Sequence, residues 1–344
     1  YLNGYPLPVD PLHVPAGWTE WYSPVDSTAY GSYNYRMNES GALVPYGRDP
    51  EDHITDVIAD KAEAAIRRAA SDPRPFFLHV STYAPHAPAD PAPRHGSLFP
   101  DAQVPRVPSF NEADVSDKPA RIQALRPLDA RAIATLDADY RKRLQSMQAV
   151  DEMVARLVTA LEETGELENT YVVFTSDNGF HMGHHRLPAG KTTAYEEDIH
   201  VPFLVRGPGV PAGRTVRGYL AGNVDLGPTF AELAGATVPD FVEGRSLAPL
   251  FRAGLPDPIT WRQAFLIEAY SGGSRANRGT PVPTTVAGPY GPVGVWEPPD
   301  PFDLSEETAT GGPQQDEGDE GAERLRYVAL RTGRYTYVES RDMP

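Results

Sequence analysis

The stretch "TSDNGFHMGHHRLPAGKTTAYEEDIHVPFLVRGPG", from Thr175 to Gly209, decides the fold. A polar loop rich in Asp, His and Lys lies here between two apolar runs, "YVVFTS" and "VPFLVRG", which are typical of buried strands. In open α/β sheets, ligands bind beyond the carboxyl ends of the strands. The stretch therefore predicts a buried sheet with a candidate site at its edge.

Helical and strand-like segments alternate on both sides of this stretch. "HITDVIADKAEAAIRRAA" and a long segment from about Ala130 to Glu163 carry apolar stripes at helical spacing, and "VDLGPTFAELAG" predicts a third helix. "PFFLHVST" and "AFLIEAY" read as further buried strands. Strands that alternate with helices predict an α/β fold with a mainly parallel sheet sandwiched by helices.

The chain divides by composition into three parts. Residues 1–270 form the expected α/β domain, and residues 271–325 form an acidic, Pro- and Gly-rich insertion that we expect to be disordered. "RYVALRTGRYTYVE" alternates around Thr-Gly and predicts a β-hairpin. We expect residues 326–344 to begin a small C-terminal antiparallel domain.

Composition excludes several classes of function. The 344 residues carry a formal net charge of -16, which argues against nucleic acid as a partner because phosphate backbones require Lys and Arg. Cysteine is absent, so the chain has no disulfide, no thiolate metal site and no Cys nucleophile. No apolar run approaches the roughly 20 residues of a membrane span.

Asp177 and Asn178 follow the strand "YVVFTS" directly. One anionic and one neutral oxygen ligand suit a hard divalent cation such as Ca²⁺ or Mg²⁺, and Gly179 lets the chain turn away sharply. Two residues do not complete a coordination shell, so other ligands must come from elsewhere. Asp-Asn-Gly is also a common turn sequence, and the residues alone leave both interpretations open.

Three further residues are candidates for this edge of the sheet. Lys191 lies in a loop between Gly190 and "TTAYEED" and is suited to gripping an anionic oxygen, although a lone loop Lys is usually solvated. His86, in "APHAP", follows another predicted strand and is suited to donating a hydrogen bond to a leaving oxygen, although a capping role is as plausible. His181 is a candidate for lining a pocket. Together they predict a metal-assisted site for an anionic ester.

At this point the sequence resembles a known family, the type I sulfatases of the alkaline-phosphatase superfamily. "YVVFTSDNGFHMGHHRLPAGKTTAYEEDIHVPFLVRGPGVPAG" resembles the family's second-half signature, and "YLNGYP", "HVPAGWTEWY" and "PFFLHVSTYAPHAP" are similar to its N-acetylglucosamine-6-sulfatase branch. The resemblance implies that Asp177 and Asn178 bind Ca²⁺, that Lys191 contacts sulfate, and that His86 lies near the bridging ester oxygen. It also implies a sulfated carbohydrate substrate and export to a periplasm, cell surface or lysosome.

The sequence departs from the family pattern, because it lacks the family's formylglycine motif, its first metal-ligating carboxylates and its N-terminal Lys and His. Sulfatases use a formylglycine made from Cys or Ser in a C/S-x-P-x-R motif, and no such motif occurs here; "SDPRP" at Ser71 has the wrong spacing. We therefore expect the chain to be a fragment that lacks the N-terminal formylglycine segment and is itself poorly soluble and inactive. A phosphodiesterase or phosphonate hydrolase of the same superfamily, and a non-catalytic glycan-binding pseudoenzyme, are the alternatives.

Overall fold

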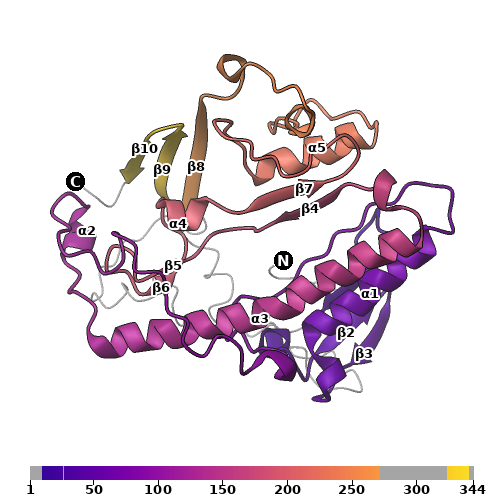
Figure 1. The fold of residues 1–344 in the computed structure, drawn as a ribbon, viewed down its shortest axis with the longest axis horizontal. Coiled ribbons are helices and arrows are strands. Elements are labelled where there is room, and N and C mark those ends of the chain that lie inside the picture. The colour runs from indigo at the N-terminus through magenta and orange to yellow at the C-terminus, as the bar shows by residue number, and fades with distance from the viewer. Residues whose placement is uncertain (1–9, 26, 272–323, 341–344) are drawn as a thin grey trace, which may run out of the picture.

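The computed structural model describes residues 10–25, 27–271 and 324–340. Two strands, β4 (Val172–Thr175) and β7 (Phe203–Arg206), lie between a pair of helices on one side and a shorter helix on the other (Figure 1). The pair consists of α1 (Ile54–Ala69) and α3 (Ala130–Glu163), and the shorter helix is α5 (Leu226–Leu233). The layers are therefore helix, sheet and helix, as an α/β fold requires.

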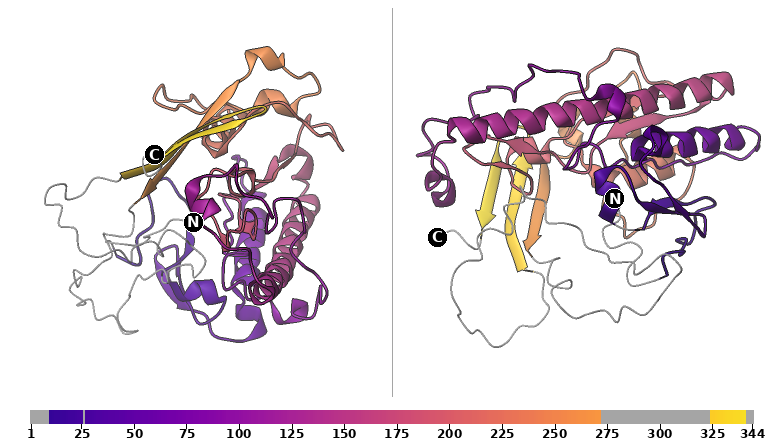
Figure 2. Two further views of the ribbon diagram at one scale, coloured as in Figure 1. Left: turned by 90° about the vertical axis from the view of Figure 1, so that its left-hand side faces the viewer. Right: turned by 90° about the horizontal axis from the view of Figure 1, so that it is seen from below.

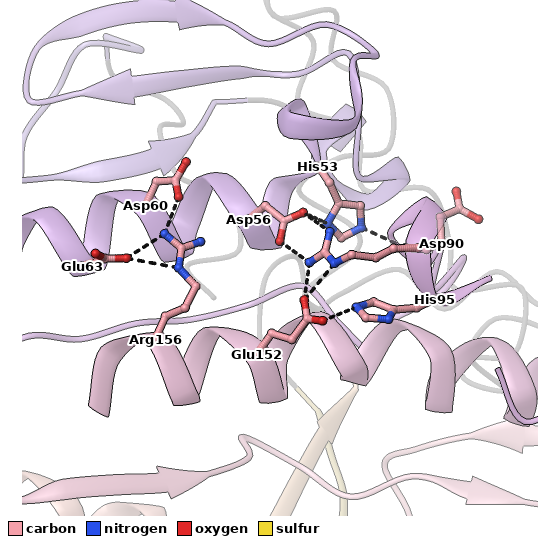
Figure 3. A network of polar contacts seen from close by, with 9 residues as sticks. His53, Asp56, Asp60, Glu63, Asp90, His95, Glu152 and Arg156 are labelled. Atoms are coloured by element: carbon pink, nitrogen blue, oxygen red, sulfur yellow. Dashed lines mark hydrogen bonds and ion pairs between the residues drawn. The ribbon is translucent and has the colours of Figure 1, made fainter. Parts of the chain in front are cut away.

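The α1–α3 pair agrees with the periodicity of its sequence. Apolar side chains of both helices meet in two clusters, one around Ile66 and Leu161 and the other around Val150 and Met153. Asp129 caps the start of α3 by accepting a hydrogen bond from the backbone N–H of Ala132 at 2.8 Å. Ion pairs tie the helices together at their rim (Figure 3), including Arg156 with Asp60, Asp56 with Arg94 and Arg94 with Glu152.

The direction of the strands differs from the sequence prediction. β4 and β7 pair antiparallel, and every strand pair within the described residues is likewise antiparallel, so the predicted mainly parallel sheet is not seen. Periodicity shows that a segment is extended, but its partner and direction depend on contacts with residues far away in sequence. For that reason the pattern could not fix the direction of pairing.

The predicted strand "PFFLHVST", residues 75–82, is also corrected by the structure. It forms no strand with any other described segment, although alternate side chains along it are half-buried and exposed as in a strand. Phe76 and Leu78 pack against the same apolar cluster as Val172, and Val80 packs against the next cluster together with Phe174. The segment therefore follows β4 in the same direction without a hydrogen-bonded ladder.

The C-terminal strands form a separate antiparallel sheet. β8 (Ala264–Ser271), β9 (Arg324–Thr332) and β10 (Thr336–Ser340) pair in the order β10-β9-β8, and Figure 2 shows this sheet projecting away from α3. The predicted hairpin is therefore present, but it completes a sheet that begins with β8. The boundaries of the three predicted domains stay a prediction, and most of the 271–325 insertion lies outside the described residues.

The remaining elements are short. A three-stranded antiparallel sheet precedes α1, and small helices and a two-stranded ladder surround the polar loop after β4; they are β1 (Tyr22–Pro24), β2 (Arg36–Glu39), β3 (Ala42–Pro45), α2 (Ala120–Gln123), β5 (His181–Met182), β6 (Ala189–Gly190) and α4 (Glu196–Ile199). Within the ranges that the structure describes, none of the helices is both long and apolar enough to cross a bilayer.

Candidate functional site

The loop after β4 presents Asp177 and Asn178 at the carboxyl end of that strand. Asp177 is exposed, and its Oδ1 accepts a hydrogen bond from the backbone N–H of Asn178 at 2.9 Å. The amide nitrogen of Asn178 donates to the carbonyl of Gly179 at 2.8 Å. No described residue donates a hydrogen bond to Asp177 Oδ2, so this oxygen and the side-chain oxygen of Asn178 are available for a ligand.

Gly179 brings this loop into direct contact with α4. Its backbone N–H donates to the carbonyl of Asp198 at 2.8 Å, and the N–H of Phe180 donates to the carbonyl of Glu197 at 2.7 Å. A Cβ atom on Gly179 would lie 2.0 Å from that Glu197 oxygen. Glycine is therefore required here because two backbones approach each other closely, rather than for a positive φ.

Three of the four histidines in the stretch 175–209 lie near three different carboxylates. His181 is 1% exposed, and its Nδ1 lies 2.9 Å from Asp198 Oδ1. His184 Nε2 lies 4.0 Å from Glu197, and burial lowers the pKa of His184. His185 lies 2.7 Å from Glu112. Each ring therefore orients part of the loop, and His181 lies inside the protein beside α4.

Lys191 follows β6 on the next part of the loop. Its side chain is half-buried, and none of the described residues forms a hydrogen bond or an ion pair with its ammonium group. Its neighbour Thr192 has φ +74°, a left-handed conformation that is a genuine outlier for a β-branched residue. A partly buried ammonium on a constrained backbone is well suited to an anionic ligand.

His86 lies in the turn that follows the extended segment 75–82. Its Nδ1 lies 2.9 Å from the carbonyl oxygen of Ala87, and its ring contacts the edge of Tyr30 at a centroid distance of 4.7 Å. A carbonyl oxygen only accepts, so Nδ1 carries a proton in this arrangement. The turn itself is anchored a few residues later, where Ser32 and His53 both bond to the carbonyl of Asp90.

The apolar clusters relate His86 to the loop after β4. Because the segment 75–82 and β4 run side by side in the same direction, the chain leaves both at the same end. His86 follows one of them, and Asp177 and Asn178 follow the other. This arrangement favours one shared edge for these residues, although their side chains do not contact one another through any described hydrogen bond.

The fit to a metal ion rests on the oxygens at this edge. A carboxylate and an amide oxygen are hard ligands of the type that Ca²⁺ and Mg²⁺ bind, and Asp177 Oδ2 has no partner among the described residues. No group of three or more His, Cys, Asp or Glu side chains within the described ranges is arranged to hold a metal. Asp177 and Asn178 therefore fit part of a coordination shell.

Two residues that support this edge, Asp198 and Asn223, were not identified as candidates from the sequence. Asp198 binds both His181 and Thr193, and Asn223 donates from its amide to the carbonyls of Ser176 and Asp177 at 3.0 Å each. Nothing in the sequence distinguishes the buried carboxylate of Asp198 from its exposed neighbour Glu196.

Comparison with known proteins defines the class of fold first. The chain aligns with a solved structure of a protein in complex with its substrate D-glucosamine-2-N,6-O-disulfate, with a TM-score of 0.66 at 21% identity, covering 96% of this chain and 68% of that one. It also aligns with the phosphonate monoester hydrolase of Silicibacter pomeroyi, with a TM-score of 0.57 at 23% identity, covering 86% of this chain and 53% of that one. Both alignments show an alkaline-phosphatase/sulfatase-like α/β fold.

The sequence comparisons then define the family. The sulfatase family model matches residues 13–236, and the chain belongs to the sulfatase family. It is 39% identical over 279 residues to human N-acetylglucosamine-6-sulfatase, covering 80% of this chain and 49% of that protein. It is 36% identical over 275 residues to an extracellular sulfatase homologue of Drosophila melanogaster, covering 78% and 24%. The chain thus spans about half the length of the human relative.

Proposed function

We propose that these residues form part of a sulfuric ester hydrolase that acts on sulfated sugars, of the N-acetylglucosamine-6-sulfatase kind. One observation carries the proposal: Lys191 has no described ionic partner and lies on a loop tied to the same short helix as the Asp177 loop. A cation and a candidate metal site, on loops tied to the same short helix, suit a sulfate ester, whose negative charge both would stabilise.

Two side chains of this chain have direct roles in the proposed reaction. Lys191 binds a non-bridging sulfate oxygen through its ammonium group and stabilises the negative charge of the bound ester. His86 faces the bridging oxygen and donates a hydrogen bond as charge develops on the departing sugar. Since Nδ1 of His86 is engaged with the Ala87 carbonyl, this donation requires a proton on Nε2.

A divalent cation, Ca²⁺ or Mg²⁺, completes the proposed site. Asp177 and Asn178 would hold it through their side-chain oxygens. When bound, the cation supplies Lewis-acid stabilisation of the sulfate oxygens. Asn223 supports these ligands from behind, because its amide fixes the carbonyls of Ser176 and Asp177.

These 344 residues contain neither Cys nor a C/S-x-P-x-R motif, and we infer that the nucleophile lies outside them. By likeness to the family, this nucleophile would be a formylglycine. The 344-residue chain alone is therefore expected to be inactive and to expose apolar groups such as Phe77, which is 59% exposed. By likeness to its relatives, we place the longer protein in an exported compartment.

The test is an assay of the longest protein that contains these residues. Three substrates are compared: N-acetylglucosamine 6-sulfate, N-acetylgalactosamine 4-sulfate and a phosphonate monoester. We expect Ca²⁺-dependent release of sulfate, fastest from the 6-sulfated glucosamine, and no turnover by the 344-residue chain.

Each other outcome would overturn part of the proposal. Faster turnover of the phosphonate would identify a phosphonate hydrolase, which shares the fold. Binding of sulfated sugars without any hydrolysis would identify a glycan-binding protein. Sulfate release by the 344-residue chain would show that the nucleophile lies within it.

A further inference from the structure

Asp198 connects the two loops that carry the proposed site. The residue is 5% exposed and lies on α4, and its carboxylate contacts the loop after β4 and the loop after β6. A carboxylate this deeply buried is stable only when donors satisfy its oxygens. Asp198 finds those donors in His181 and Thr193, one residue in each loop.

The first connection reaches the loop of Asp177 and Asn178. His181 Nδ1 lies 2.9 Å from Oδ1 and 3.0 Å from Oδ2 of Asp198. Because the carboxylate accepts, this contact places a proton on Nδ1. The other ring nitrogen, Nε2, is buried and has no hydrogen-bond partner among the described residues. The backbone carbonyl of Asp198 accepts a second bond, from Gly179. Both bonds fix the position from which Asp177 and Asn178 project.

The second connection reaches the loop of Lys191. Thr193 donates to Asp198 Oδ2 from its backbone N–H at 2.8 Å and from its hydroxyl at 2.6 Å. Thr192, between Thr193 and Lys191, holds its left-handed φ of +74°. Such a strained backbone persists only when its surroundings over-determine it. The two bonds from Thr193, and one from Tyr327 to the Thr192 carbonyl at 3.3 Å, supply that restraint.

We propose that Asp198 is a positioning residue, which fixes the Asp177–Asn178 loop and the Lys191 loop relative to each other through His181 and Thr193. This inference rests on the proposed function for its catalytic meaning. Asp198 does not touch the substrate. It sets the separation between the metal ligands and the ammonium, a separation that a tetrahedral oxyanion must match on both sides.

The central variant is Asp198→Asn, which keeps the shape of the side chain and replaces one acceptor with an NH₂ donor. The amide oxygen is expected to face the two donors of Thr193, so the NH₂ group faces His181. His181 must then accept at Nδ1 and carry its proton on Nε2. In ¹⁵N-histidine NMR spectra, Nδ1 of His181 should be protonated in the wild type and unprotonated in the variant. An unprotonated Nδ1 of His181 in the wild type would overturn the proposal.

Hydrogen exchange tests whether the two loops depend on Asp198. Loss of a charge-assisted bond should accelerate exchange in residues 176–183 and 189–195 by about tenfold or more. The matched control is Asp137→Asn, another buried carboxylate, which binds Val104 and Arg106 instead. Unchanged exchange in either loop of Asp198→Asn, or equal acceleration in the control, would contradict the proposal.

A second pair of variants keeps the proposal testable if Asp198→Asn does not fold. Thr193→Val removes only the hydroxyl donor to Asp198, whereas Thr193→Ser retains it. In the longer protein, Thr193→Val should raise KM for the sulfate ester about tenfold through the Lys191 loop, and Thr193→Ser should restore it. If both variants behave like the wild type, the hydrogen bond from the Thr193 hydroxyl to Asp198 has no positioning role.

The readouts separate this inference from the proposed function. The NMR and exchange measurements need no turnover, so they decide the role of Asp198 even if the longer protein hydrolyses no sulfate ester. Conversely, an active wild type whose Thr193→Val and Asp198→Asn variants keep its kcat/KM would overturn the role of Asp198 alone.

Discussion

The α1–α3 helix pair and the loops around α4 use charged side chains in opposite ways. Asp56 of α1 and Glu152 of α3, both labelled in Figure 3, pair with Arg94, and 43% of the arginine side chain is exposed. Around α4, the carboxylate of Asp198 is buried and fully engaged with two loops. Exposed pairs contribute little because water competes for both ions, whereas a buried carboxylate depends on every donor it has.

This difference shows where each region obtains its shape. Apolar clusters formed by residues at helical spacing hold the helix pair together, and its charged side chains lie at the rim. The loops around α4 contain strands of only two residues and several residues with positive φ, so specific hydrogen bonds must hold them. Single changes should therefore have their largest consequences around α4 and smaller ones at the rim of the helices.

The largest effect is expected from Lys191→Ala in the longer protein. Removing one preorganised electrostatic contact to a reacting oxyanion costs about 10²–10³-fold in rate, and kcat/KM for the sulfated sugar should fall by that amount. Lys118→Ala is the control, because Lys118 is paired with Glu112 and Asp117 rather than available to a ligand. Equal losses in the two variants would remove Lys191 from the site.

Gly179→Ala should destabilise the region around α4. The added Cβ would lie 2.0 Å from a backbone oxygen of Glu197, and a backbone cannot move aside as a side chain end can. We expect a loss of about 3 kcal/mol in the free energy of unfolding, at the upper end of the range for overpacking. Urea denaturation measures it.

Gly227→Ala is the matched control for Gly179→Ala. Gly227 lies in α5 with nothing within 4 Å of an added Cβ, so alanine should stabilise by up to about 1 kcal/mol. Two glycine variants with the same sign of effect would contradict the assigned close approach at Gly179.

A smaller effect, in the helix pair, depends on pH. His53 is 1% exposed, and burial lowers its pKa below the usual 6.5. The unfolded chain therefore binds a proton at higher pH than the folded chain does, so this contribution to stability is fully present above about pH 6.5 and falls as the pH decreases from there. The groups near His53 are Asp56, Arg94, His95, the Asp90 carbonyl and the Tyr33 ring.

Urea denaturation between pH 7.5 and 5 tests this dependence on His53. His53→Gln should flatten the decline in stability, while His200→Gln, at an exposed histidine, should leave it unchanged. A steeper decline in His53→Gln would show that His53 binds protons more readily in the folded state.

The smallest effect is expected at the rim of the helix pair. Arg94→Ala should reduce the free energy of unfolding by about 1 kcal/mol at low salt, because the pairs with Asp56 and Glu152 are partly exposed. The loss should shrink in 1 M NaCl, where screening weakens the pairs in the wild type. A loss that is large and independent of salt would mean that the rim is as critical as the region around α4.

Local periodicity predicted the helices well and the strand pairing poorly. The helix expected from about Ala130 to Glu163 has those bounds in the structure, because its apolar stripe lies within the segment and its N-cap, Asp129, directly precedes it. The predicted parallel sheet failed because β4 pairs with β7 in the antiparallel direction. Pairing depends on residues that are far apart in the sequence, and no repeat or turn signal fixed the direction.

The candidate site shows the same division between local and distant information. Asp177, Asn178 and Lys191 stand out in the sequence because their residue types suit an anionic ester, and their roles stay a prediction. Asp198 does not stand out, since its importance comes from burial and from donors in two loops that only the folded chain brings together. A run of three acidic residues gives no sign of which one turns inward.

The most direct test is a crystal structure of the longer protein grown with Ca²⁺ and inorganic sulfate. We predict Ca²⁺ within about 2.6 Å of side-chain oxygens of Asp177 and Asn178, and sulfate within about 3.2 Å of the Lys191 ammonium, with the His86 ring facing the same anion. Side chains at positions 86, 177, 178 and 191 that face separate parts of the molecule, with the ions bound elsewhere, would contradict a shared sulfate-ester site.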